Sequence, residues 1–152
     1  MFILIIEDDS QKAEKIKSLI EEIDPDGRMQ ICRSYQGGLR WLSDASHIVD
    51  LVVLDMSLPT FDPIPDQRPG RPRPLGGYDL MRKIRRTGHE PAVVVLTALE
   101  NFGSRSEQIT FEELESRCAT EFPDMFKGAI HYSQSSSAWR SELVAIIKEV
   151  SC

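Results

Sequence analysis

Short apolar runs alternate along this chain with segments in which apolar residues recur every three or four positions. The apolar runs predict buried strands, because a strand covered on both faces is continuously hydrophobic. We expect strands at Met1–Ile6, Met29–Cys32, Ile48–Leu54, Ala92–Thr97 and Gly128–Tyr132. The helical spacing predicts helices between Ser10 and Pro25, at Gln36–Ala45, from Gly77 to near Gly88, at Ile109–Phe122 and from Ala138 to Val150. This alternation predicts an α/β fold, a doubly wound parallel sheet with helices on both faces.

The first predicted helix is amphipathic. Its apolar face contains Ala13, Ile16, Leu19, Ile20 and Ile23. The opposite, charged face is predicted to contain Lys12, Lys15, Lys17, Glu21 and Glu22.

Polar residues follow three of the predicted strands at the point where each strand ends. Glu7-Asp8-Asp9 follows the first strand, Asp55 follows the third, and Thr97 ends the fourth. The carboxyl ends of parallel strands meet at one edge of a sheet, which is where ligands bind in such folds. Clustered carboxylates suit a divalent cation, and the pattern favours phosphoryl chemistry with Mg²⁺.

The segment from Leu58 to Gly76 interrupts the alternation and predicts a long loop. It holds six of the nine prolines, which remove backbone donors and resist both helix and sheet. Its arginines are Arg68, Arg71 and Arg73, which could form an anion or partner site. We favour the interpretation that they keep a solvated loop soluble. A second, shorter loop is expected at Asn101–Glu107.

Composition and charge exclude several classes of protein. The chain has 152 residues, which fits one domain, and a formal net charge of −6, which disfavours a broad nucleic-acid surface. We find neither a signal peptide nor an apolar stretch of the ~20 residues that a membrane span needs. The cysteines, Cys32, Cys118 and Cys152, are too widely spaced for a zinc site and odd in number for a disulfide framework. We therefore expect a cytoplasmic protein.

Four motifs in order along the chain resemble the receiver domain of bacterial two-component response regulators. They are Ile-Leu-Ile-Ile-Glu-Asp-Asp at the start, Asp50–Pro59, Gly77-Tyr78-Asp79-Leu80 and Val94–Ala98. The resemblance covers Phe2 to about Val150 and implies a flavodoxin-like three-layer α/β/α sandwich, with five strands in the order 2-1-3-4-5. We expect a single receiver domain over residues 1–152, with long insertions at about 58–76 and 99–124 and no output domain.

The resemblance also implies roles for individual residues. Asp55 is expected to be the phosphoacceptor and Thr97 the switch hydroxyl. Glu7, Asp8, Asp55 and the backbone carbonyl of Ser57 are expected to hold Mg²⁺ or Mn²⁺, with Glu7 acting through water. The family's fifth strand normally ends in a lysine that pairs with the phosphoryl group; here Tyr132 falls in that position. The aromatic partner of the switch hydroxyl falls on Ala129.

We therefore expect a signalling switch that accepts a phosphoryl group from a histidine kinase or phosphotransfer protein and then changes its affinity for a downstream protein. It would catalyse its own phosphorylation without being a turnover enzyme, and act as a monomer or a phosphorylation-dependent homodimer without nucleic acid or membrane. The alternative is a pseudo-receiver, a binding module that works without phosphorylation. An aspartate-nucleophile phosphatase is less favoured, because Ser57 stands where its general acid is needed.

Overall fold

The computed structural model describes residues 1–64, 72–103 and 106–152. Five parallel strands form the central sheet, in the order β2-β1-β3-β4-β7. The strands are β1 (Phe2–Ile6), β2 (Arg28–Cys32), β3 (Leu51–Leu54), β4 (Ala92–Thr97) and β7 (Phe126–His131). Since β7 is the fifth strand of this sheet, the doubly wound topology and the predicted strand order are confirmed.

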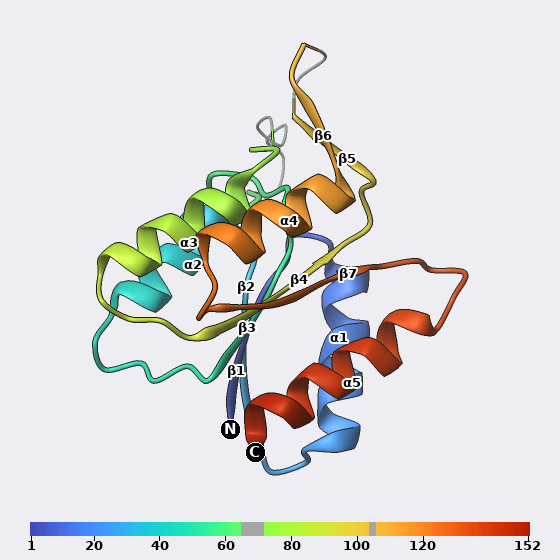
Figure 1. Ribbon diagram of the computed structural model, residues 1–152. Helices are drawn as coiled ribbons and strands as arrows, with labels where there is room; N and C mark the ends of the chain where they lie inside the picture. Colours follow the sequence, from blue (N-terminus) through green and yellow to red (C-terminus); the bar gives the residue numbers. More distant parts are fainter. Residues whose placement is uncertain (65–71, 104–105) are drawn as a thin grey trace.

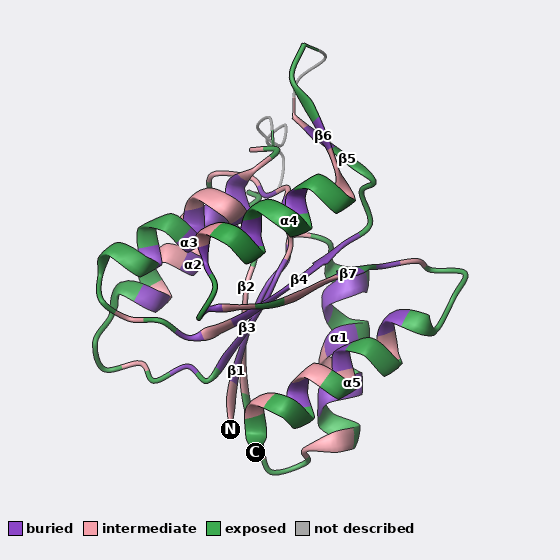
Figure 2. Cartoon of the chain, in the orientation of Figure 1, coloured by how far each residue is buried: buried purple, intermediate pink, exposed green. Residues whose placement is uncertain are grey.

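Two layers of helices cover the sheet (Figure 1). One face carries α1 (Ser10–Ile23) and α5 (Ala138–Ser151); the other carries α2 (Tyr35–Ser43), α3 (Gly76–Arg86) and α4 (Phe111–Glu121). Neighbouring residues of one strand supply different cores: Ile3 packs on the side of α1 and α5, whereas Leu4 packs on the opposite side. The central strands are buried along most of their length (Figure 2), which explains their continuous apolar sequences.

The strand register sets the position of the polar ends. Ile6 pairs with Leu54, and Leu54 pairs with Val95. The next residues along these strands therefore leave the sheet at the same edge. This edge holds the acids that follow β1 and β3, together with Thr97 at the end of β4.

Two of the predicted secondary-structure assignments were wrong. The loop expected at Asn101–Glu107 begins with β5 (Asn101–Gly103), which pairs antiparallel with β6 (Gln108–Thr110) at the start of the predicted helix; this hairpin extends away from the sheet in Figure 1. Strands of three residues are too short to show a periodic pattern. The third strand also begins later than expected, because Ile48 lies in the preceding connection with 75% of its surface exposed.

The proline-rich segment is attached to the fold at both of its described ends. Leu58 and Arg73 exchange backbone hydrogen bonds, and the carbonyls of Pro59 and Thr60 accept hydrogen bonds from the first two residues of α2. Arg68 and Arg71 lie outside the described residues, so their predicted solvated role stays a prediction. Arg73 is only partly exposed and its guanidinium lies over the ring of Tyr35, so the solvated interpretation was wrong for this residue. Among the described residues, no helix combines the length and the apolarity required to cross a membrane.

Candidate functional site

Three carboxylates meet at the carboxyl edge of the sheet. Glu7 and Asp8 follow β1, and Asp55 follows β3; one oxygen from each lies within 4.8 Å of the others. Glu7 is buried, whereas the other two are partly exposed. Three hard oxygen donors, two of them on partly exposed side chains, fit Mg²⁺, which usually takes one or two carboxylates and keeps water as its remaining ligands. The predicted convergence of these acids is therefore present in the structure.

Asp55 is held by the backbone on both sides. Its amide donates a hydrogen bond to the carbonyl of Ile6 at 3.0 Å, continuing the pairing of β3 with β1. Its Oδ1 accepts a hydrogen bond from the amide of Met56 at 2.7 Å. The side chain is 14% exposed, so a small donor in solvent can approach it.

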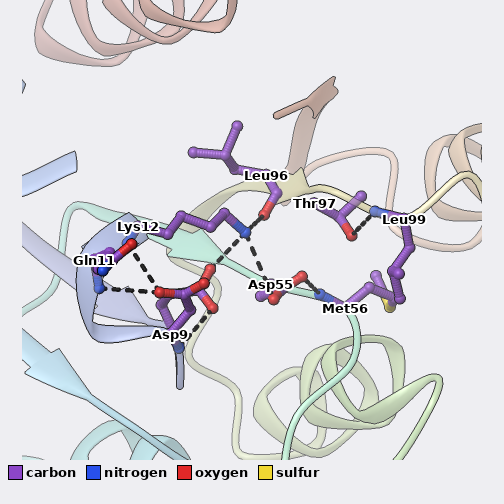
Figure 3. A network of polar contacts seen from close by, with 9 residues as sticks. Asp9, Gln11, Lys12, Asp55, Met56, Leu96, Thr97 and Leu99 are labelled. Atoms are coloured by element: carbon purple, nitrogen blue, oxygen red, sulfur yellow. Dashed lines mark hydrogen bonds and ion pairs between the residues drawn. The ribbon is translucent and has the colours of Figure 1, made fainter. Parts of the chain in front are cut away.

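Lys12 occupies the same pocket, which is a correction to the sequence analysis (Figure 3). The charged face of the first helix was predicted to carry it, yet its side chain is only 4% exposed. Its Nζ donates a hydrogen bond to the carbonyl of Leu96 at 2.7 Å. It also lies 2.5 Å from Oε1 of Glu7 and 3.5 Å from Oδ2 of Asp55.

The sequence held a signal for this position that was missed. Lys12 precedes Ile16 by four residues and Leu19 by seven, which is the spacing of one helix face. Lys12 was predicted to face solvent because it is charged, although its spacing places it on the apolar face of the helix.

Burial and charge act in opposite directions on Glu7. Burial, followed by the negative charge of Asp55, raises the pKa of the Glu7 carboxyl to about 8, while the Lys12 ammonium opposes this increase. Glu7 Oε2 also accepts a hydrogen bond from the amide of Asp9 at 3.2 Å. Bringing a divalent cation to this pocket would favour the ionised form of the carboxyl.

Thr97 ends β4, and Ser57 follows Asp55 by two residues; the role predicted for each of them stays a prediction. Thr97 is fully buried at the end of β4, where its Oγ1 accepts a hydrogen bond from the amide of Leu99 at 3.3 Å. Ser57 is partly buried two residues after Asp55. A hydroxyl that accepts a weak local hydrogen bond is free to reorient toward a new partner.

Tyr132 is buried immediately after β7, and its amide donates a hydrogen bond to the carbonyl of Thr97 at 2.8 Å. Its ring centroid lies 5.4 Å from Nζ of Lys12 and 5.1 Å from the ring centroid of Trp139. The position at which the family has a lysine thus holds an aromatic ring, which lies beside Lys12. His131, the preceding residue, is exposed and contacts Phe111 edge to face.

The sequence matches the family model of the response regulator receiver domain over residues 3–112, and the chain belongs to this family of signal transducers. It is 26% identical over 151 residues to the Detocs response regulatory protein DtcB of Enterobacter cloacae, covering 99% of this chain and all of the relative. It is 25% identical over 143 residues to the uncharacterized protein y4jR of Sinorhizobium fredii, with 92% of each covered.

Solved receiver structures share the fold. A response regulator receiver domain from Clostridium thermocellum has a TM-score of 0.63 at 21% identity, covering 98% of this chain and 92% of that one. A CheX-CheY-BeF3-Mg²⁺ complex from Borrelia burgdorferi has a TM-score of 0.69 at 14% identity, covering 100% and 90%. At these identities the similarity establishes the fold alone.

Proposed function

We propose that this protein is a phosphorylation-dependent switch that accepts a phosphoryl group on Asp55 from the phosphohistidine of a histidine kinase or phosphotransfer protein. The observation that carries the proposal is the convergence of Glu7, Asp8 and Asp55 around one point at the carboxyl edge of a receiver-family sheet. Carboxylates repel one another, so a cluster with no ligand role would be costly to keep.

The acids divide the work of binding and reaction. Asp8, Asp55 and the carbonyl of Ser57 would hold Mg²⁺ directly, with Glu7 acting through water. Held there, Mg²⁺ would supply positive charge that reduces the repulsion between a phosphoryl donor and the Asp55 carboxylate. Asp55 is the nucleophile, and the amide of Met56 fixes the orientation of its carboxylate.

The output is a changed affinity for another protein. Thr97 would turn its hydroxyl toward the phosphoryl group and lose the hydrogen bond that it accepts from the amide of Leu99. This movement would change the conformation of the surface formed by α4 and β7. The protein would remain a monomer or form a homodimer on phosphorylation, and would act in the cytoplasm. It would catalyse its own phosphorylation and dephosphorylation without turning over a separate substrate.

The test is phosphorylation by a small donor. Incubation with Mg²⁺ and phosphoramidate is expected to add one phosphoryl group to the parent protein, seen by intact-mass spectrometry. Asp55→Asn is expected to abolish the addition, because an amide is a poor nucleophile. Asp26→Asn, the same change at an exposed turn residue, is the matched control and is expected to react like the parent. A parent protein that is not modified, or one modified equally without Asp55, would overturn the proposal.

A second candidate function is a pseudo-receiver that binds partners without phosphorylation. One observation favours it: Lys12 already pairs with Glu7 and Asp55, so these acids have a partner in the absence of metal. The same experiment separates the two functions. A folded parent protein that binds Mg²⁺ yet shows no Asp55-dependent modification would support the pseudo-receiver.

A further inference from the structure

Lys12 is a buried cation placed against the proposed phosphoacceptor. In the parts of the chain that the structure describes, it is the only Lys or Arg side chain that forms an ion pair with Glu7, Asp8 or Asp55. Burying an ammonium is costly unless it is paired and hydrogen-bonded; Lys12 donates a hydrogen bond to the carbonyl of Leu96 and forms ion pairs with Glu7 and Asp55. Its position is therefore strongly determined by the surrounding structure.

Helix α1 aims this side chain at the pocket. The carboxylate of Asp9 accepts hydrogen bonds from the amides of Gln11 and Lys12, which fixes the first turn. Side chains on a helix tilt toward its N-terminus, and the N-terminus of α1 lies at the edge where β1 ends. A lysine in the first turn on the apolar face therefore reaches back over the acids rather than outward.

The fifth strand of the sheet cannot supply this charge. The residue in the lysine position is Tyr132, whose ring lies 5.4 Å from the Lys12 ammonium. The neighbouring His131 is exposed and packs against Phe111, and Lys127 lies near the opposite end of β7. The ring of Tyr132 instead forms a wall that holds the Lys12 ammonium among its acceptors, with cation–π attraction adding to the contact.

We propose that the Lys12 ammonium stabilises the phosphoryl group on Asp55, supplying from helix α1 the fixed positive charge that strand β7 lacks. The inference rests on the proposed function. An oxygen of Asp55 forms a bond to phosphorus while the P–N bond of the donor breaks. The electron pair of that bond stays on the leaving nitrogen, so a phosphohistidine that carries a proton on its other ring nitrogen departs as neutral imidazole. The acyl phosphate adds negative charge beside Lys12.

Lys12 can meet this charge without losing its anchor. Its hydrogen bond to the carbonyl of Leu96 can persist while a phosphoryl oxygen replaces a carboxylate oxygen as partner. Leu96 precedes Thr97 in β4. Through its hydrogen bond to the carbonyl of Leu96, Lys12 therefore connects the acids to the strand that carries the proposed switch hydroxyl. A fixed cation in a buried site stabilises developing charge far better than one in water.

The experiment compares the parent with Lys12→Met, which keeps an unbranched chain and removes the charge, and with the double variant Lys12→Met, Tyr132→Lys, which returns a cation from the strand. Lys15→Met, an exposed position on the same helix, is the matched control. Four quantities are measured: Mg²⁺ affinity by calorimetry, beryllofluoride binding by tryptophan fluorescence, the phosphorylation rate with phosphoramidate, and the melting temperature.

We expect Lys12→Met to bind Mg²⁺ at least as tightly as the parent, because a competing cation has been removed from two carboxylates. Its phosphorylation rate and beryllofluoride affinity are expected to fall by at least about tenfold, as with loss of a charge-stabilising donor. The double variant is expected to recover part of both, and Lys15→Met to match the parent. Recovery by a cation placed elsewhere would exclude a purely structural role.

Two results would overturn the inference alone: parent-like phosphorylation in Lys12→Met, or a loss that accompanies unfolding and is not recovered by Tyr132→Lys. Failure of the proposed function is recognised separately. In that case the parent and Asp55→Asn both fail to be phosphorylated, and the inference about Lys12 falls with it.

Discussion

The guanidinium of Arg73 lies over the ring of Tyr35, 4.0 Å from its centroid. Arg73 is also paired through its backbone with Leu58, and its Nη2 lies 3.5 Å from Oδ2 of Asp79 in α3. Tyr35 is buried in the first turn of α2. One arginine therefore joins the returning end of the proline-rich segment to two helices beside the site.

We expect Arg73→Ala to lower the free energy of unfolding by about 1 kcal/mol, through loss of the cation–π contact, the packing of its side-chain stem and a partly exposed ion pair. Urea unfolding followed by circular dichroism measures the change. Arg86→Ala, at the exposed end of α3, is the control and is expected to change stability by less than about 0.5 kcal/mol. Equal effects of the two substitutions would show that the contact with Tyr35 does not stabilise the fold.

Gly77 connects the site to helix α3 through close backbone packing. Its amide donates a hydrogen bond to the carbonyl of Met56 at 2.9 Å. A Cβ at this position would lie 2.6 Å from the carbonyl oxygen of Asp55 and 3.1 Å from the Cα of Met56. Neither contact can be relieved by rotating a side chain.

We therefore expect Gly77→Ala to displace the backbone that carries Asp55 and to cost roughly 1–3 kcal/mol of stability. Phosphorylation with phosphoramidate is expected to slow as well, because the nucleophile is moved. Gly76→Ala is the comparison, since its Cβ would meet only side-chain carbons at 3.2 and 3.4 Å and backbone at 3.7 Å. If thermal unfolding showed Gly77→Ala to be the milder of the two, the packing argument would be wrong.

The strands β1, β3 and β4 could be predicted because each is an apolar run with a polar residue at its end, whereas the strand order was implied by the resemblance to receiver domains. The acids that follow β1 and β3 could be placed together for the same reason, since parallel strands end at one edge. The position of Lys12 was missed because residue charge outweighed helical spacing in the interpretation. The β5–β6 hairpin was missed because strands of three residues are too short to show a periodic pattern. The pairing of Phe102 with Ile109 therefore left no signal in the sequence.

The three thiols differ in environment. Burial raises the pKa of Cys118 to about 12, with the charge of Glu115 adding to the effect, and burial raises that of Cys32 to about 11, with Asp62 adding. Cys152 is exposed near the end of α5. Because the thiolate is the reactive form, we expect one fast thiol in the native protein, located at Cys152.

Titration with a chromogenic disulfide reagent at neutral pH measures this directly. One equivalent is expected to react at once, and the other two only slowly or after unfolding in urea. Cys152→Ser is expected to remove the fast phase without altering the slow ones. A fast phase that survives this substitution would mean that Cys32 or Cys118 is more accessible than the structure shows.

Glu7 should make the metal-free protein less stable as the pH rises. Its carboxyl pKa is about 8 in the folded protein against 4.5 when unperturbed, because of burial and then the charge of Asp55. Between these values the folded state binds more protons than the unfolded state, so the free energy of unfolding falls with increasing pH. The contribution of Glu7 is fully present below about pH 4.5 and is lost as the pH rises through about 8.

Glu7→Gln is expected to flatten this part of the stability profile, measured by urea unfolding in the presence of a chelator from pH 5 to about 9. In the parent, Mg²⁺ affinity should increase over the same range, because metal binding favours the ionised carboxyl and releases a proton near neutral pH. Calorimetry in buffers of different ionisation enthalpy detects that proton. Mg²⁺ binding without proton release at pH 7, together with an unchanged stability slope in Glu7→Gln, would mean that Glu7 is ionised in the metal-free pocket and that the Lys12 ammonium outweighs its burial.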